Sequence, residues 1–348
     1  MNPTELPSKR IEYIDALRGF SMILVIYFHI PSYCLGNAYL GYNDIIGWFR
    51  MPLFFFISGF VFYKPNRIWN SMTIKRIIKQ KFITLFIPFI IFMLLYLYVF
   101  DYMSFSSFGS DKKGYWFTFV LFEYFALYIG LEALFNRKRT NKGDFCIMTT
   151  VLLISITALY YLKYYITYAE ELGNWKTFLG LLSFVKFRHF IFFWLGVITR
   201  KHFATFVKIS DNKYIMAVAI VLFIAIAINP FIYYKLEYLS FVLTGIIGIF
   251  IVFTFFRKHE TSFSKEKIIG RGLQYVGRRT LDIYLIHYFI LPYNLQSIGI
   301  WLQQYDSKTC EMIVILPLAL WITTLSLILS SIIKTSPFLA RYLFAAKK

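Results

Sequence analysis

The stretch RIEYIDALRGFSMILVIYFH, residues 10–29, starts with charged residues and continues as an apolar run. A helix that crosses a bilayer needs about 20 mainly apolar residues. The run over 14–33 meets this requirement, although it contains Arg18 and His29. In the whole chain of 348 residues, 58% are hydrophobic and only 16% are charged, whereas soluble domains carry about 25% charged residues. The sequence therefore predicts an all-α integral membrane protein.

Nine further apolar runs of spanning length follow the first. The ten expected transmembrane helices cover residues 14–33, 45–63, 82–100, 115–135, 145–165, 178–199, 214–232, 236–256, 273–292 and 311–333. The connections between them are too short to hold another folded domain. We therefore expect a single membrane-embedded domain over residues 1–348, with its core at 10–333.

The distribution of lysine and arginine between alternate loops predicts the orientation. With the N-terminus inside, 27 of the 37 basic residues lie in inner segments and 6 in outer segments. Cytoplasmic loops carry such an excess, so we expect both termini to be cytoplasmic and the protein to be a multi-pass component of the inner membrane. The net charge of +19 would otherwise suggest nucleic-acid binding. Cations placed between apolar runs argue against that.

Two features of the outer side and the N-terminus leave alternatives. The first apolar run has the shape of a signal peptide, but it contains Arg18 and His29 and no small-residue cleavage pattern follows it closely. Cys34, Cys146 and Cys310 lack the spacing of a metal site or a disulfide framework. A disulfide between Cys34 and Cys310 is an alternative, because both fall on the predicted outer side. No metal and no tightly bound cofactor are expected.

Arg18 and His29 are the clearest candidates for chemistry. An ionisable group within a span costs about 2.5–3.5 kcal/mol on insertion scales, so each needs a reason. Their spacing of eleven positions places them within about 20° of one helix face and roughly 16 Å apart along the axis. Asp15, one turn before Arg18, is expected to orient its guanidinium. The alternative is that Arg18 extends to the interface and His29 is a hydrogen-bonded core residue.

Other polar residues within the spans have either a functional or a structural interpretation. Ser58-Gly59 interrupts a bulky run, where a ligand or another helix can approach the backbone closely. Glu123 in the fourth span and a basic group in the sixth either line a polar tunnel or form structural ion pairs. That basic group consists of Lys186, Arg188 and His189.

Three more groups lie near the ends of spans. Arg50 is expected to extend to the outer interface, and Asp282 to pair with Arg278 at the inner one. His287 lies deeper, inside the ninth span, and is a candidate for a direct role.

Four stretches together resemble the membrane proteins of acyltransferase family three. Residues 10–29 resemble the family's opening signature, in which an Asp precedes an Arg and ten residues separate that Arg from a His. PLFFFISGF (52–60) resembles its second-helix motif, YWF (115–117) a Trp-aromatic pattern that opens a later helix, and RTLDIYLIH (279–287) a Tyr-Leu-x-His segment. Many members carry a histidine two residues before that tryptophan, where this chain has Gly114, so no role of that histidine is transferred.

The resemblance implies O-acyl transfer, most often of an acetyl group, from cytoplasmic acyl-CoA to a hydroxyl of an extracytoplasmic or lipid-linked glycan. Inner basic loops would attract the phosphates of the donor, and Arg18 would position it through bidentate hydrogen bonds. His29 would act as the base or as the acyl carrier. The expected partners are therefore acyl-CoA, a glycan acceptor, the bilayer and other proteins of envelope biosynthesis. Acetyl and succinyl groups are both open.

An exporter of glycans or lipids is the alternative function, because many helices with a few buried charges also describe transporters. The sequence lacks a pair of Gly/Pro-interrupted helices in matching halves, which argues against it. A membrane scaffold with degenerate motifs is a third possibility.

Overall fold

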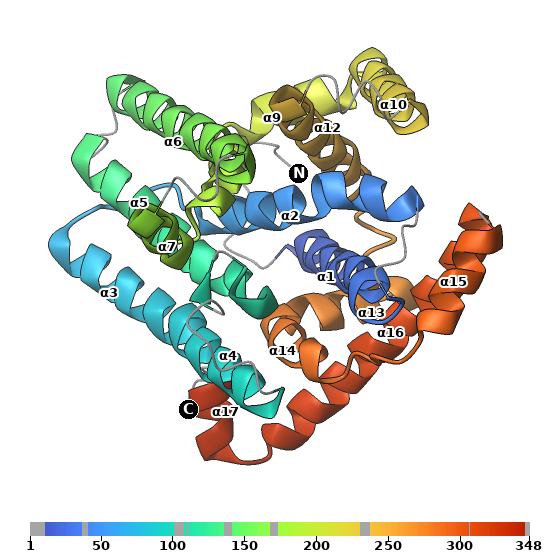
Figure 1. The fold of residues 1–348 in the computed structure, drawn as a ribbon. Coiled ribbons are helices and arrows are strands. Elements are labelled where there is room, and N and C mark those ends of the chain that lie inside the picture. Colours follow the sequence, from blue (N-terminus) through green and yellow to red (C-terminus); the bar gives the residue numbers. More distant parts are fainter. Residues whose placement is uncertain are drawn as a thin grey trace. The chain divides into compact units, whose positions relative to one another are not determined.

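The computed structural model describes residues 11–36, 41–100, 108–109, 111–135, 141–167, 173–229, 237–305 and 307–344. These residues form helices and no β-strand (Figure 1), which confirms the predicted all-α class. Among them, seven helices are long and apolar enough to cross a membrane. The number is eight if Phe184–Lys201 and Phe203–Asp211, which meet at a bend of 96°, form one span. The protein is thus a multi-pass membrane protein.

The described residues therefore support seven or eight spans instead of the expected ten, and two of the expected runs explain most of the difference. The run over 214–232 corresponds to α10 (Lys213–Ile228), which is apolar but short. The run over 273–292 is not one helix. Helix α13 (Ile268–Arg278) ends at a charged pair of arginines, α14 (Thr280–Ile286) follows, and His287–Phe289 form a 3₁₀ turn.

Internal contacts divide the chain into two compact units, each assembled from two separate segments. The first unit consists of residues 1–60 and 196–332, and the second of residues 61–195 and 333–348. Both units combine early and late parts of the sequence. The single domain over 1–348 stays a prediction.

The first unit contains helices from both ends of the chain. Besides α10, α13 and α14, they are α1 (Glu12–Tyr33), most of α2 (Gly41–Phe62), α9 (Phe203–Asp211), α12 (Glu237–Lys258), α15 (Gln296–Tyr305) and α16 (Lys308–Ile333). Its core is aromatic: the buried rings of Phe56 and Phe60 both pack edge-on against Phe253 of α12.

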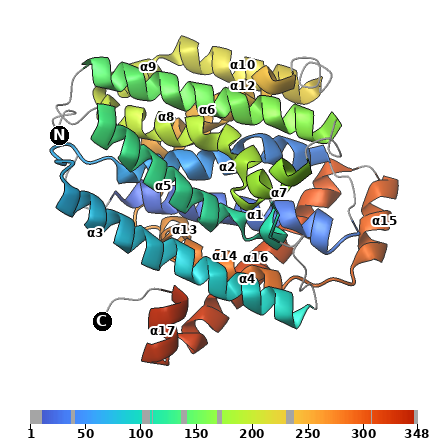
Figure 2. The same ribbon diagram turned by 60° about the vertical axis from the view of Figure 1, so that its left-hand side comes forward.

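Glycines bring α1 and α13 into backbone contact, and the two helices run side by side in Figures 1 and 2. A Cβ atom on Gly19 would lie 2.0 Å from the Leu273 carbonyl oxygen, and one on Gly277 would lie 1.8 Å from the Asp15 carbonyl oxygen. Any larger side chain would separate the helices, because van der Waals contact begins well beyond these distances. This packing fixes where the segment after α13 meets α1.

The second unit contains α3 (Ser71–Lys81), α4 (Ile87–Val99), α5 (Trp116–Phe135), α6 (Asn141–Thr167), α7 (Gly173–Leu181), the first half of α8 (Phe190–Lys201) and α17 (Pro337–Phe344). A π-helical turn, Phe82–Phe86, joins α3 to α4, so that Ser71–Val99 form one long rod (Figure 2). The expected span at 82–100 is the apolar half of this rod. A 3₁₀ helix, Phe184–His189, precedes α8.

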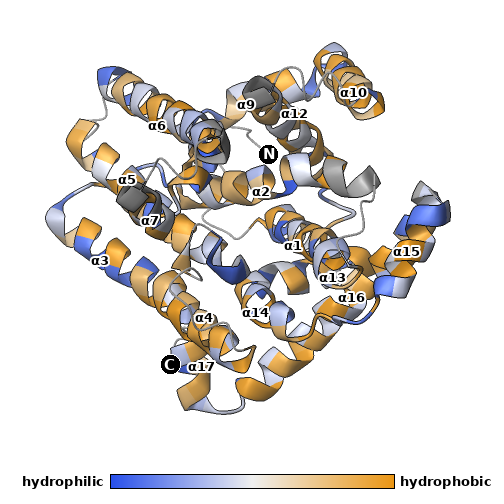
Figure 3. Cartoon of the chain, viewed as in Figure 1, coloured by the Kyte–Doolittle hydropathy of each residue, from blue (hydrophilic) through white to orange (hydrophobic). Residues whose placement is uncertain are grey.

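Apolar side chains cover the exposed faces of several helices, as expected for surfaces in contact with lipid. Helix α4 exposes Leu94 and Leu95, and α16 exposes Ile313 and Trp321. Both helices are coloured mostly as hydrophobic in Figure 3. All three cysteines are free, so the alternative of a disulfide between Cys34 and Cys310 is not formed in this structure.

Candidate active site

In the first unit, the structure brings together two of the predicted histidines. The ring centroid of His29 on α1 lies 5.5 Å from that of His287 and 5.4 Å from that of Tyr288. Tyr33, one turn further along α1, adds a third ring at 5.5 Å. Residues from the two ends of the chain therefore form one aromatic cluster, because α1 packs along the segment that carries His287.

The two histidines differ in their surroundings. His287 is fully buried, and its Nδ1 lies 2.8 Å from the Tyr284 carbonyl oxygen and 3.1 Å from that of Ile283. Since carbonyls only accept, Nδ1 carries the proton and Nε2 is left as an acceptor. That Nε2 has no hydrogen-bond partner among the described residues. Buried polar atoms normally have one, so this nitrogen is an unused acceptor for a polar group of a substrate or a water molecule.

His29 is only partly buried, so a substrate can take the place of one of its present contacts. The nearest polar group is the Tyr288 hydroxyl, 3.3 Å from Nε2. This distance is longer than usual for a hydrogen bond between nitrogen and oxygen. A substrate hydroxyl can therefore replace the tyrosine as the partner of Nε2.

The sequence suggested that Arg50 extends to the outer interface. In the structure it lies at this cluster instead. Its guanidinium carbon lies 3.5 Å from the centre of the Phe28 ring, and its charge acts on His29. A buried cation beside a histidine can stabilise negative charge that develops on a nearby oxygen. Arg50 was expected at the outer interface because its position at the end of a span is typical of an interfacial residue. Tyr288 was not among the predicted residues, although it directly follows the family-like RTLDIYLIH segment.

The predicted basic residue of the first span lies at a second contact between the same segments. Arg18 Nη2 donates a hydrogen bond to Thr280 Oγ1 at 3.3 Å. Asp15, whose carbonyl oxygen faces Gly277, is buried on α1. Arg18 and His29 thus both meet the α13–α14 segment from one helix, at two levels. That Asp15 orients Arg18 stays a prediction.

Asp282 and Arg278 each have a partner other than the one expected. The buried carboxylate of Asp282 accepts a hydrogen bond of 2.8 Å from the Ser330 hydroxyl on α16. Arg278 Nε donates to the Gln274 carbonyl oxygen at 3.2 Å. The first contact links α14 to α16, whereas the second lies within α13.

The Ser58 side chain forms a hydrogen bond to the backbone of its own helix, which gives this residue a structural role. Its hydroxyl donates to the Phe54 carbonyl oxygen one turn earlier, at 2.9 Å. A close helix approach lies two residues away, where a Cβ on Gly196 would lie 2.0 Å from the Phe56 carbonyl oxygen. The close approach here is made by Gly196 of the neighbouring helix, and a close approach at Ser58-Gly59 stays a prediction.

The second unit contains a separate polar cluster around a buried lysine that the sequence did not single out. Lys112 Nζ donates to Ser183 Oγ at 2.7 Å and to the carbonyl oxygen of Leu181 at 2.9 Å, and it also contacts Gly180. Burial lowers the pKa of Lys112 to about 8, against the opposing charges of Glu123 and Asp111. Lys112 thus fastens the turn before α5 to the turn after α7.

The other predicted residues of the second unit lie around this cluster. Lys186 pairs with Asp111, and its carbonyl oxygen is 3.1 Å from His189 Nδ1. Arg188 acts electrostatically on Tyr124. Glu123 interacts with Lys112, while its buried Oε2 accepts no hydrogen bond from the described residues. For Lys186, the reading as a structural ion pair is the one that the contacts favour.

The missing histidine of the family pattern has a backbone explanation. Gly114 has φ = +97°, a conformation that side-chain-bearing residues rarely adopt. Trp116 is the first residue of α5, as the motif requires, and its ring lies 6.0 Å from that of His189. A histidine at position 114 would require a different turn.

The fold and this site define a multi-pass helical membrane protein in which two imidazole rings lie side by side. The chain belongs to acyltransferase family three, because the signature of the family's acyltransferase domain matches residues 11–335. The match runs through segments of both units. The protein is therefore a membrane-bound acyltransferase. No curated protein and no solved structure matches the chain.

Proposed function

We propose that the protein transfers an acyl group, with acetyl as the first choice, from cytoplasmic acyl-CoA to a hydroxyl of an extracytoplasmic or lipid-linked glycan. The observation that carries this proposal is the cluster of His29 with His287 and Tyr288, together with the position of Arg18 on the same helix as His29. The family match supports acyl transfer, and the distribution of basic residues supports a donor that arrives from the cytoplasm.

In this proposal His29 is the general base. Its Nε2 exchanges the long contact to Tyr288 for the acceptor hydroxyl and takes the proton as the acceptor oxygen attacks the thioester carbonyl. The C–O bond forms and the C–S bond breaks. The proton passes from the imidazolium to the departing thiolate, so that His29 is neutral again for the next cycle. The charge of Arg50 lies close enough to stabilise the oxyanion.

Arg18 has the complementary role in the same proposal. It lies about 16 Å before His29 along the axis of α1, toward the predicted cytoplasmic face. A guanidinium there binds a phosphate or thioester oxygen of the donor through paired hydrogen bonds. Asp15 and Thr280 hold it in position. The donor therefore enters from the inner side, and the acceptor meets the thioester at His29. The protein would reside in the cytoplasmic membrane, beside other enzymes of envelope biosynthesis.

Three strains test this function: the wild type, a deletion strain, and the deletion strain complemented with His29→Ala. Mass spectrometry of the surface glycans should show loss of acyl groups without loss of glycan in the last two. Complementation with His259→Ala is the matched control and should restore acylation, because the described contacts of that side chain are with Phe255 of the preceding helix.

Two results would contradict the proposal. Loss of the glycan itself in the deletion strain would favour the exporter. Normal acylation with His29→Ala, at wild-type protein level, would exclude the assigned base.

A further inference from the structure

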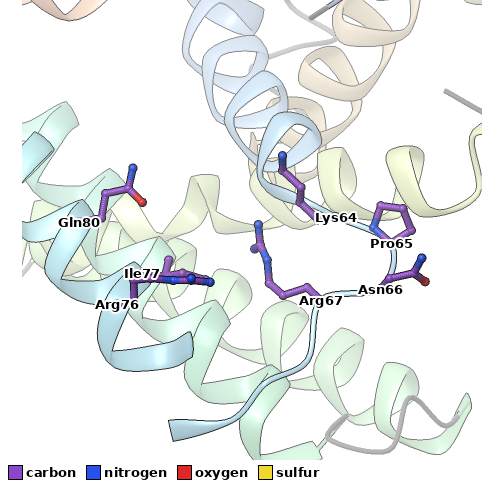
Figure 4. Close-up of a pocket in the computed structure, with 7 residues that line it drawn as sticks. All are labelled: Lys64, Pro65, Asn66, Arg67, Arg76, Ile77 and Gln80. Carbon is purple, nitrogen blue, oxygen red and sulfur yellow. The ribbon is translucent and has the colours of Figure 1, made fainter. Parts of the chain in front are cut away.

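A basic pocket lies in the second unit, where the chain leaves α2 and starts α3. It has a volume of about 550 Å³ and is lined by Lys64 and Arg67 from the turn and by Arg76, Ile77 and Gln80 from α3. Figure 4 shows Arg76 extending from α3 toward Arg67. The predicted orientation places this pocket on the cytoplasmic side.

The charge of the pocket is of one sign. Residues 61–81 contain six lysines and arginines and no aspartate or glutamate. Lys64 and Arg76 are exposed, and neither forms an ion pair with a carboxylate among the described residues. Concave surfaces with one sign of charge concentrate ligands of the opposite sign.

The turn that carries the pocket has a defined shape. Asn66 adopts a left-handed conformation with φ = +49°. The guanidinium of Arg67 lies 4.6 Å from the centre of the Phe62 ring and 5.3 Å from that of Trp69, both of which are buried. The Asn70 side chain caps α3 by accepting from Thr73 N at 2.8 Å. Arg67 is thus held against two neighbouring aromatic rings, while Lys64 and Arg76 line the pocket.

We infer that this pocket binds the phosphate groups of the nucleotide part of the acyl donor, an inference that rests on the function proposed above. Arginines bind phosphate through paired hydrogen bonds and stack on planar bases. Ile77 offers an apolar surface and Gln80 an amide for the base. The volume falls within the range of small-ligand sites, about 300–1,000 Å³. Arg18 and this pocket would then hold different parts of one donor.

Anionic lipid headgroups share the phosphate chemistry, so the experiment separates the two sources. The protein in nanodiscs of phosphatidylcholine alone is titrated with coenzyme A, dephospho-coenzyme A and adenosine. The variants are Arg76→Gln and Lys64→Gln. The control is Lys142→Gln, which removes an exposed cation of the same unit that does not line the pocket.

The inference predicts that Arg76→Gln raises the Kd for coenzyme A about 5- to 10-fold, as expected for one charge-assisted contact at an exposed site. Lys64→Gln should act in the same direction, and Lys142→Gln should not. For each pocket variant, KM for acyl-CoA should rise while kcat stays within about twofold. Dephospho-coenzyme A should bind more weakly than coenzyme A to the wild type and lose that difference in at least one of the two pocket variants.

The other outcomes overturn the inference in distinguishable ways. If acyl transfer from acyl-CoA proceeds but both variants bind coenzyme A like the wild type, the pocket assignment is wrong and the proposed function stands. If the variants change only the retention of phosphatidylglycerol in mixed nanodiscs, the pocket is a lipid site. If the wild type binds no coenzyme A at all, the assignment and the proposed donor both fail.

Discussion

The two units each contain a buried polar cluster, and the clusters differ in how far their hydrogen bonds are satisfied. In the second unit, Lys112 donates to several carbonyl oxygens and to Ser183, and Lys186 pairs with Asp111. In the first unit, His287 leaves one ring nitrogen without a partner among the described residues, and His29 has one long contact to Tyr288.

This difference distinguishes a structural cluster, which stabilises the fold, from a reactive site. A cation surrounded by acceptors stabilises the two turns that it joins and has little capacity left for a ligand. An imidazole with an unused nitrogen or a weak contact can bind a substrate without first losing a strong bond. Glu123 is intermediate, because it interacts with Lys112 while its Oε2 accepts no hydrogen bond from the described residues. The comparison predicts that substitutions in the first cluster reduce activity and that those around Lys112 reduce stability.

After His29, whose replacement is described last, the largest effect is expected at Arg18. Arg18→Ala should lower kcat/KM for acyl-CoA about 10- to 100-fold, the range for a lost hydrogen bond to a charged group. The kcat/KM of Arg18→Lys should lie between those of Arg18→Ala and the wild type, because lysine keeps the charge but cannot form paired hydrogen bonds. The measurement is acyl transfer by purified protein, with Thr280→Val as a control for the internal hydrogen bond. Equal activity of Arg18→Ala and the wild type would remove Arg18 from donor binding.

His287→Ala should reduce kcat about tenfold per folded protein, because His287 positions the ring of His29 and offers an acceptor to the substrate. The pH profile of kcat separates this role from a loss of folding, since a changed imidazole environment shifts the profile while partial unfolding only scales it. An unchanged profile with a lower melting temperature would make His287 a packing residue.

Lys112→Met tests the opposite cluster. It leaves buried carbonyl oxygens without a donor, so the free energy of unfolding should fall by about 1–3 kcal/mol, while kcat per folded protein stays near the wild-type value. Thermal melting in detergent measures this, with the exposed Lys142→Met as the control. Loss of activity at unchanged stability would place Lys112 in the reaction.

The same lysine predicts a pH dependence. The folded-state pKa of Lys112 is about 8, below its ordinary value of 10.5, so between these values the unfolded chain binds more protons than the folded one. Stability from this group therefore rises with pH over that window. The melting temperature of the wild type relative to Lys112→Met should increase from pH 8 to pH 10 and stay constant below pH 7. A relative decrease over that window would contradict the assigned direction.

The smallest effect is expected at Ser58. Its hydroxyl bonds to the backbone of its own helix, so Ser58→Ala should change kcat and KM less than about twofold, as for other helical back-bonds of this kind. Ser58→Leu is the informative comparison, because it adds bulk beside the close contact at Phe56 and Gly196. A large loss of activity with Ser58→Ala would show that the hydroxyl contacts a substrate.

The helical membrane class followed from the apolar runs, and the pair of Arg18 and His29 from their shared helix face. What the sequence could not provide was the packing of α1 on α13, which depends on Gly19 meeting a carbonyl oxygen more than 250 positions later. Spacing along one helix says nothing about such contacts. Fewer spans qualify among the described residues than hydropathy predicted, partly because hydropathy reads 273–292 as one run, although arginines divide it. Arg50 looked like an interfacial residue until its contact with Phe28 placed it beside His29.

The central claim is that His29 is the reactive base and that His287 supports it. Chemical rescue measures this most directly, because His29 is partly exposed and His287 is fully buried. We expect His29→Gly to lower the transfer rate at least about 100-fold, within the range of general-base contributions, and added imidazole to restore part of it in a saturable manner. His287→Gly should not respond to imidazole. A His29→Gly protein that transfers acyl groups at the wild-type rate, or rescue confined to His287→Gly, would contradict the account.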